Sequence, residues 1–168
     1  MTMIQKKICM LGATGVGKTS LVRRFVQSIY SEKYHTTIGV KIDKKAVNVE
    51  GQEVGLLLWD LQGEDGEFKI RPSFLRGAAG YLLVLDLTRH ESLVTAFSIQ
   101  KMVKREVGDL PFFALFNKND LTEDFEITDS ELQIVTEEGW KMLRTSAKTG
   151  ENVEEAFFQL AKDTLEIN

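Results

Sequence analysis

The sequence predicts an α/β fold, in which a six-stranded, mostly parallel sheet is covered on both faces by about five helices. Apolar runs of strand length alternate with helical patterns along all 168 residues. Runs such as residues 112–116 are apolar without interruption, which is typical of strands buried on both faces. Because no linker, repeat or low-complexity stretch interrupts this alternation, we expect one domain over residues 1–168.

The elements follow one another in a regular order. A strand over residues 4–11 precedes a helix over 18–28. Two strands, 38–49 and 53–59, are joined by a turn at Glu50-Gly51, which is too short for a crossover and therefore predicts an antiparallel pair. We expect the remaining elements in this order: helix 66–76, strand 80–86, helix 91–107, strand 111–116, helix 129–138, strand 140–145 and helix 151–166.

Composition and charge narrow the possible functions. The chain is 43 % hydrophobic and 27 % charged with a net charge of −4, which is ordinary for a soluble globular protein. It has no basic block, so neither nucleic acid nor an anionic membrane is an expected partner. No apolar run is long enough to span a bilayer. The single cysteine, Cys9, lies in the first strand, where a structural thiol is favoured over a reactive one. We expect a cytoplasmic monomer.

The most informative segment is residues 12–19, which read G-A-T-G-V-G-K-T between the first strand and the first helix. The G-x-x-x-x-G-K-T pattern in this setting is a nucleotide phosphate loop. Its glycines let successive N–H groups point inward around an anion, and the helix adds its positive end. Lys18 is expected to reach the β- and γ-phosphates, and the Thr19 hydroxyl to bind Mg²⁺. The predicted nucleotide-binding residues are Gly12, Thr14, Gly15, Val16, Gly17, Lys18, Thr19 and Ser20.

Two later motifs indicate which base is bound. Residues 117–120 (N-K-N-D) follow a buried strand, at the edge where ligands bind in this architecture. Asp120 can accept two hydrogen bonds from guanine, whereas adenine offers no such pair of donors; the mismatch is worth ~1–3 kcal/mol. Residues 145–148 (T-S-A-K) end the next strand and can supply an N–H to the guanine oxygen. The predicted base-site residues are Asn117, Lys118, Asp120, Ser146, Ala147 and Lys148.

From Lys6 to its last helix, the chain resembles a small GTPase of the Ras superfamily, closest to the Rab- or Rap-like branches. Besides the three motifs above, Thr37 falls at the position of the family's first-switch threonine, and Asp60 with Gly63 matches the second-switch D-x-x-G. Residues 71–78 also resemble the Rab second-switch helix. The resemblance implies the P-loop NTPase G-domain fold.

The resemblance also implies a switch between GTP and GDP. Mg²⁺ would be held by the phosphates, Thr19 and, in the triphosphate state, Thr37, with Asp60 acting through a water. The Gly63 N–H would contact the γ-phosphate, so loss of that phosphate would release both switch loops. Effectors, exchange factors and activating proteins would bind through residues 34–42 and 61–76. Tyr30 falls where the family places an aromatic ring against the base; a core or surface aromatic is the alternative.

Two positions depart from the family near the γ-phosphate. Glu64 stands where the family usually has a glutamine that orients the attacking water, and a carboxylate there adds like-charge repulsion. Gln62 could substitute if the loop is shifted. Thr14 crowds the space through which an activating protein would insert an arginine finger. The expected catalytic residues are Lys18, Thr37 and Glu64. We therefore expect a slow GTPase that stays loaded with GTP, or one whose activator works without the usual arginine finger. In the alternative, Glu64 faces solvent and hydrolysis is normal.

Other functions remain open at this point. The chain could be a scaffold that holds GTP with negligible hydrolysis. It could also be an ATP-dependent P-loop kinase, although Asp120 argues against adenine. The sequence ends at Asn168 without a terminal cysteine and begins without the glycine that myristoylation requires, so no lipid anchor is expected.

Overall fold

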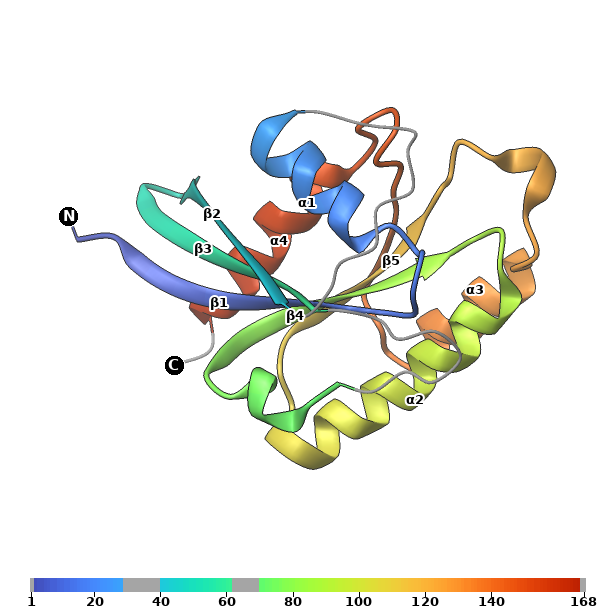
Figure 1. Ribbon diagram of the computed structural model, residues 1–168, viewed down its shortest axis with the longest axis horizontal. Coiled ribbons are helices and arrows are strands. Elements are labelled where there is room, and N and C mark those ends of the chain that lie inside the picture. Colours follow the sequence, from blue (N-terminus) through green and yellow to red (C-terminus); the bar gives the residue numbers. More distant parts are fainter. Residues whose placement is uncertain (1, 29–39, 62–69, 167–168) are drawn as a thin grey trace.

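A six-stranded sheet forms the centre of the molecule in the computed structural model, which describes residues 2–28, 40–61 and 70–166. The sheet order is β2-β3-β1-β4-β5-β6, with only β2 antiparallel to its neighbour (Figure 1). The predicted sheet and its antiparallel pair are thereby confirmed. The strands are β1 (Ile4–Leu11), β2 (Val40–Val49), β3 (Gln52–Leu61), β4 (Ala78–Asp86), β5 (Phe112–Asn117) and β6 (Met142–Arg144).

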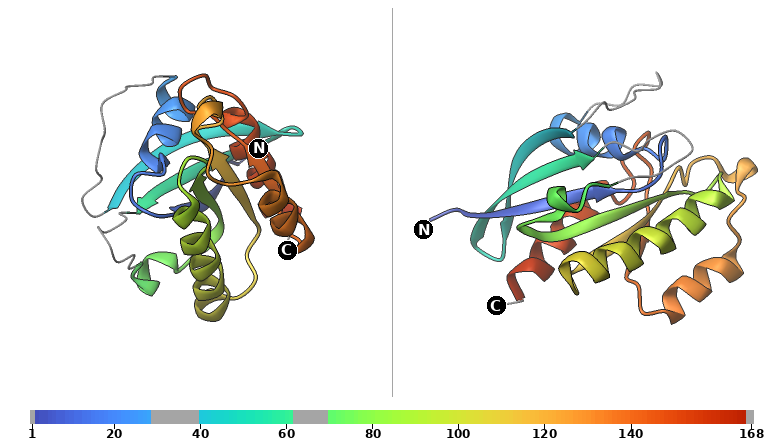
Figure 2. Two further views of the ribbon diagram at one scale, coloured as in Figure 1. Left: turned by 90° about the vertical axis from the view of Figure 1, so that its right-hand side faces the viewer. Right: turned by 60° about the horizontal axis from the view of Figure 1, so that its bottom comes forward.

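Helices cover both faces of this sheet. Helices α1 (Lys18–Gln27) and α4 (Val153–Glu166) pack on one face. Helices α2 (His90–Val107) and α3 (Asp129–Glu137) lie on the other (Figures 1 and 2). None of the described helices is long and apolar enough to cross a membrane.

The prediction of a helix over residues 66–76 is wrong in its described part. Only the short 3-10 helix Pro72–Leu75 forms there, because the residue before a proline is driven out of the helical region. Arg71 is accordingly extended, with φ −72° and ψ 121°. Residues 66–69 lie outside the described part, and the described residues form four α-helices rather than about five. A second 3-10 helix, Thr122–Asp124, was not predicted.

Each face of the sheet has its own apolar core, and β1 contributes to both. Ile8 and Met10 pack with α1 and α4, whereas Cys9 and Leu11 pack with α2 and α3. This alternation explains why the strand reads as a continuous apolar run. Cys9 is fully buried, and burial raises the pKa of its thiol to about 11, which favours the structural role over a reactive one.

The topology brings the functional motifs to one edge of the sheet. Because β1, β3, β4, β5 and β6 are parallel, their carboxyl ends meet there. The loop after β1 leaves this edge at Gly12, which has φ +151°. A Cβ atom on Gly12 would lie 2.4 Å from the Val84 carbonyl oxygen, so only glycine fits between β1 and β4.

The rings of Phe25 and Phe157 stack in the core beneath α1, and substitution of one of them measures how much this core stabilises the fold. Their centroids lie 4.0 Å apart with an interplanar angle of 4°. We expect Phe157→Ala to lower the free energy of unfolding by about 3–5 kcal/mol, because it leaves a cavity between α1 and α4. Urea unfolding measures the loss. Ile134→Ala, at a side chain 52 % exposed on α3, is the control and should cost much less. Equal losses would contradict this assignment of the core.

Candidate functional site

The carbonyl oxygens of the phosphate loop, residues 12–17, all accept hydrogen bonds, and their donors come from several elements. In order, the donors are Lys18 Nζ to Gly12 (2.8 Å) and Ala13 (2.9 Å), Arg89 Nη1 to Thr14 (2.7 Å), Lys118 Nζ to Gly15 (3.2 Å), Asn117 Nδ2 to Val16 (3.0 Å) and the Leu21 N–H to Gly17 (2.9 Å).

The bonds at Thr14, Gly15 and Val16 fix the direction of three successive peptides. Their carbonyls are held by side chains from outside the loop. In a trans peptide the N–H points opposite to the carbonyl, so the next N–H groups face the concave side. Gly15 and Gly17 have φ +79° and +107°, which the curl requires. The backbone is therefore arranged as an anion-binding nest.

Lys18 supplies the positive charge inside this loop. Its side chain is buried, and burial lowers the pKa of its ammonium group to about 8. The Asp60 carboxylate opposes this lowering, whereas the Arg89 guanidinium adds to it. An anion bound beside Lys18 would stabilise the charged form and raise the pKa again.

Two hard oxygen donors lie together at the edge of the loop. The Thr19 hydroxyl, in the first turn of α1, donates to Asp60 Oδ2 at 2.5 Å. Asp60, near the end of β3, is almost fully buried. The described residues contain no group of three or more His, Cys, Asp or Glu side chains that could hold a metal. A hydroxyl and a carboxylate fit Mg²⁺, which is commonly bound by one or two protein ligands together with phosphate oxygens.

A cavity of about 240 Å³ lies beside the phosphate loop. Its lining residues come from the phosphate loop, the first turn of α1, both predicted base motifs and the residue after the first of these motifs: Gly17, Ser20, Asn117, Lys118, Asp120, Leu121, Ala147 and Lys148. The Ser146 hydroxyl donates to Asp120 Oδ1 at 2.7 Å and so orients this carboxylate. The cavity thus places an oriented acceptor next to a phosphate nest.

Polar contacts connect the base motifs to the phosphate loop. The buried Asn117 donates to the Val16 carbonyl and accepts from Thr145 Oγ1 at 3.2 Å. Lys118, which has a left-handed backbone with φ 66°, forms a 2.8 Å ion pair with Asp86 Oδ2 at the end of β4. Phosphate loop and base motifs therefore form one connected unit.

The predicted site residues that the structure describes all lie together at the phosphate loop and the adjoining cavity. The other predicted site residues lie outside the described part of the chain: Tyr30, Thr37, Gly63 and Glu64, together with Gln62. Sequence reasoning missed Asp86 and Arg89. Asp86 ends a buried strand at the ligand edge, and that position could have indicated it. Arg89 carries no motif, and only the fold places it beside the loop.

Comparison with known proteins identifies the family. The model of the Ras family matches residues 7–166. The Ras-related protein Rab-4A of Rattus norvegicus is 37 % identical over 163 residues, which cover 95 % of this chain and 74 % of the relative. The Ras-related proteins Rab-13 of Canis lupus familiaris and Rab-8B of Homo sapiens are 33 % and 32 % identical over 161 residues. These matches cover 95 % of this chain and 79 % and 78 % of the relatives.

The mostly parallel sheet with its phosphate loop defines the G-domain class of P-loop NTPases. The chain belongs to the Ras family, in its Rab-like branch. It is therefore a GTP-binding GTPase that acts as a switch.

The depressed pKa of Lys18 predicts a pH dependence of nucleotide affinity. The ammonium titrates near pH 8 in the free protein and at higher pH beside phosphates, so binding takes up a proton above pH 8. The affinity for GDP should fall as pH rises above 8, by at most about tenfold per unit. Isothermal titration between pH 7 and 9 measures this slope. In Lys18→Arg, whose guanidinium stays charged, affinity should be weaker but flatter with pH; equal slopes would contradict the assignment.

Proposed function

We propose that this chain switches between GTP- and GDP-bound states with Mg²⁺ at the described site, and that it hydrolyses GTP slowly. The observation that supports the site best is the placement of Asp120 in a cavity lined also by Gly17 of the phosphate loop. An oriented carboxylate at one end and an N–H nest with Lys18 at the other match a guanine base and its phosphates.

The assignment of guanine can be tested at Asp120. Asp120→Asn replaces one of the two acceptors by a donor, so it should weaken GDP binding by about 10- to 100-fold. ADP binding should change much less, because adenine offers no paired donors to the carboxylate. Asp124→Asn, in the neighbouring 3-10 helix, is the matched control and should leave both affinities unchanged. Equal losses for GDP and ADP would argue against base recognition by Asp120.

The metal and the phosphates have proposed ligands of their own. Thr19 would bind Mg²⁺ directly, and Asp60 would hold it through a water; their 2.5 Å contact supports this pairing. Thr37 and Gly63 would complete the γ-phosphate contacts, and Tyr30 would lie against the base. Bound Mg²⁺ would neutralise phosphate charge while Lys18 holds the β- and γ-phosphates.

Thr14 supports the proposal of slow hydrolysis. Its Oγ1 atom is buried and has no hydrogen-bond partner within the described part of the chain, and its carbonyl is held by Arg89. A β-branched side chain at a fixed peptide cannot easily make room for an incoming arginine finger. Glu64 would add a second obstacle, since a carboxylate has no amide N–H to orient the attacking water.

Single-turnover hydrolysis of bound GTP tests this proposal. We expect the wild type to be slower than the Rab-4A relative, and Glu64→Gln to accelerate it. Thr14→Gly should increase the acceleration by an arginine-finger activator. The finger itself is worth ~10³- to 10⁵-fold in rate in this class. A wild-type rate equal to that of Rab-4A, unchanged by Glu64→Gln, would contradict the role of Glu64.

A scaffold that holds GTP with negligible hydrolysis is the second candidate. The buried Thr14 hydroxyl supports the scaffold as much as it supports slow hydrolysis, because in both cases the Thr14 side chain obstructs an arginine finger. The nucleotide that co-purifies with the chain separates the two. Bound GDP indicates a working hydrolase, whereas persistent GTP indicates the locked form.

The proposed switch would act through protein partners. Effectors, exchange factors and activating proteins would bind through residues 34–42 and 61–76 and would respond to the presence of the γ-phosphate. The described part of this surface includes the start of β2 and the 3-10 helix Pro72–Leu75. We further propose that the chain works as a cytoplasmic monomer without direct nucleic-acid contact.

A further inference from the structure

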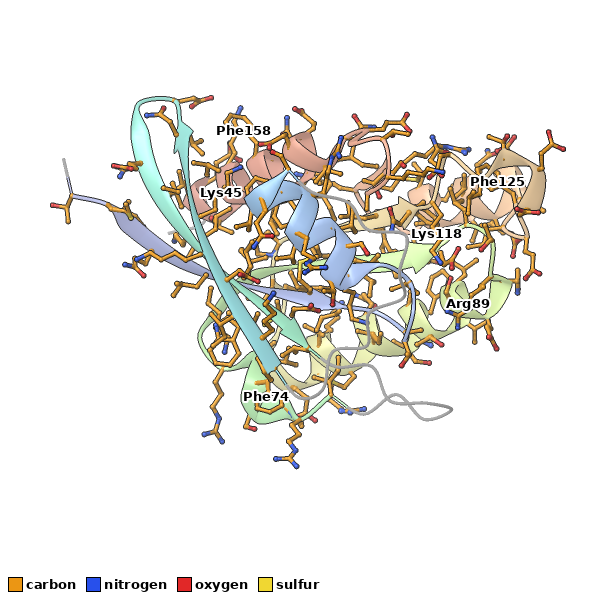
Figure 3. All side chains as sticks on the ribbon, turned by 45° about the horizontal axis from the view of Figure 1, so that its top comes forward. Lys45, Phe74, Arg89, Lys118, Phe125 and Phe158 are labelled. Carbon is orange, nitrogen blue, oxygen red and sulfur yellow. The ribbon has the colours of Figure 1, made fainter. Side chains whose placement is uncertain are left out.

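Arg89 is a charged side chain that holds a carbonyl of the phosphate loop and has no role in hydrolysis assigned above. It is the N-cap residue of α2, and its Nη1 donates to the Thr14 carbonyl at 2.7 Å. Its Nη2 lies 3.4 Å from Glu91 Oε1. Figure 3 shows Arg89 and Lys118 at the same end of the molecule.

We propose that Arg89 is a positioning residue for GTP hydrolysis, which holds the Thr14–Gly15 peptide with its N–H toward the phosphates. This inference rests on the proposed function, because it requires that GTP is hydrolysed at this site.

The first step of the argument is the freedom of the peptide that Arg89 holds. Gly15 has φ +79°, and a glycine can exchange this conformation for others at little steric cost. A Thr14–Gly15 peptide without an external donor could therefore turn its carbonyl inward, toward bound phosphate. Such a turn would replace an attractive N–H by a repulsive oxygen at the nest.

The second step is the rigidity of Arg89 itself. Its N–H donates to the Asp86 carbonyl at 3.0 Å, and its own carbonyl accepts from the buried Ser92 hydroxyl at 2.7 Å. The guanidinium is planar, so a contact with Glu91 on one nitrogen sets the direction of the other. The backbone of Arg89 is thus fixed, and its partly exposed side chain is directed toward the loop by its contacts with Glu91 and with the Thr14 carbonyl.

The third step is the reach of the Arg89 charge. The guanidinium donates to a carbonyl of the phosphate loop, whose concave side is expected to hold the phosphates, so its positive charge lies directly behind the nest. A fixed positive charge behind the loop favours states in which negative charge develops on the phosphates. The hydrogen bond and the charge therefore act in the same direction on hydrolysis.

Substitution of Arg89 separates this role from a merely structural one. We expect Arg89→Ala to slow single-turnover hydrolysis by about tenfold or more, because a small misplacement of one phosphate contact is costly. Arg89→Lys should recover part of the rate, since it keeps the charge but not the fork. GDP affinity should fall less than the hydrolysis rate, and the melting temperature should stay near that of the wild type.

Arg24→Ala is the matched control, because Arg24 Nη2 also donates to a loop carbonyl, that of Thr149, at 3.0 Å. It should leave the hydrolysis rate unchanged. A wild-type rate for Arg89→Ala, or equal losses in hydrolysis, GDP affinity and melting temperature, would overturn the proposal.

A phosphorus NMR spectrum gives a second readout that needs no turnover. The resonances of a bound, non-hydrolysable GTP analogue should shift in Arg89→Ala and stay in place in Arg24→Ala; an unshifted spectrum in Arg89→Ala would count against the proposal. The absolute hydrolysis rate of the wild type tests the proposal of slow hydrolysis. The ratio of the Arg89→Ala rate to the wild-type rate tests the role of Arg89. Either proposal can therefore fail while the other holds.

Discussion

The hydrogen bond from Asn117 to the Val16 carbonyl is the contact on which the geometry of the site depends. Asn117 ends β5 and is only 2 % exposed, so an unpaired amide there would be costly. Its other side-chain atom, Oδ1, accepts from Thr145, which follows β6. One buried amide therefore fixes the loops after β1, β5 and β6 relative to one another, and with them the spacing between base cavity and phosphate nest.

Charge balance around the phosphate loop is the second constraint. Lys18, Arg89 and Lys118 all donate to loop carbonyls, while Asp60 and Asp86 lie among them as buried counter-charges. Lys118 is neutralised by its ion pair with Asp86, so it acts mainly as a support. Burial is the main cause of the lowered Lys18 pKa, and repulsion between Lys18 and Arg89 adds to it. A bound anion would relieve this repulsion, which favours phosphate at this place.

Sequence reasoning succeeded where a local pattern determines the outcome. Continuous apolar runs predicted buried parallel strands, and the glycine spacing predicted the curl at Gly15 and Gly17. It failed at residues 71–76, where the effect of Pro72 on Arg71 outweighed the helical pattern. Arg89 could not be predicted, because its contact with Thr14 spans 75 positions and exists only through the pairing of β1 with β4. A lone arginine after a strand carries no local signal for such a contact.

Neighbouring peptides of the phosphate loop are held by donors that differ in burial, and this difference bears on function. The Val16 carbonyl is held by a buried amide, whereas the Thr14 carbonyl is held by Arg89, whose side chain is 36 % exposed. A contact open to water is weaker and more easily changed than a buried one. Within the phosphate nest, the Val16 peptide is therefore held more firmly than the Thr14–Gly15 peptide, which is easier to alter. In such an arrangement, the rate of hydrolysis can diverge between relatives while nucleotide recognition is retained.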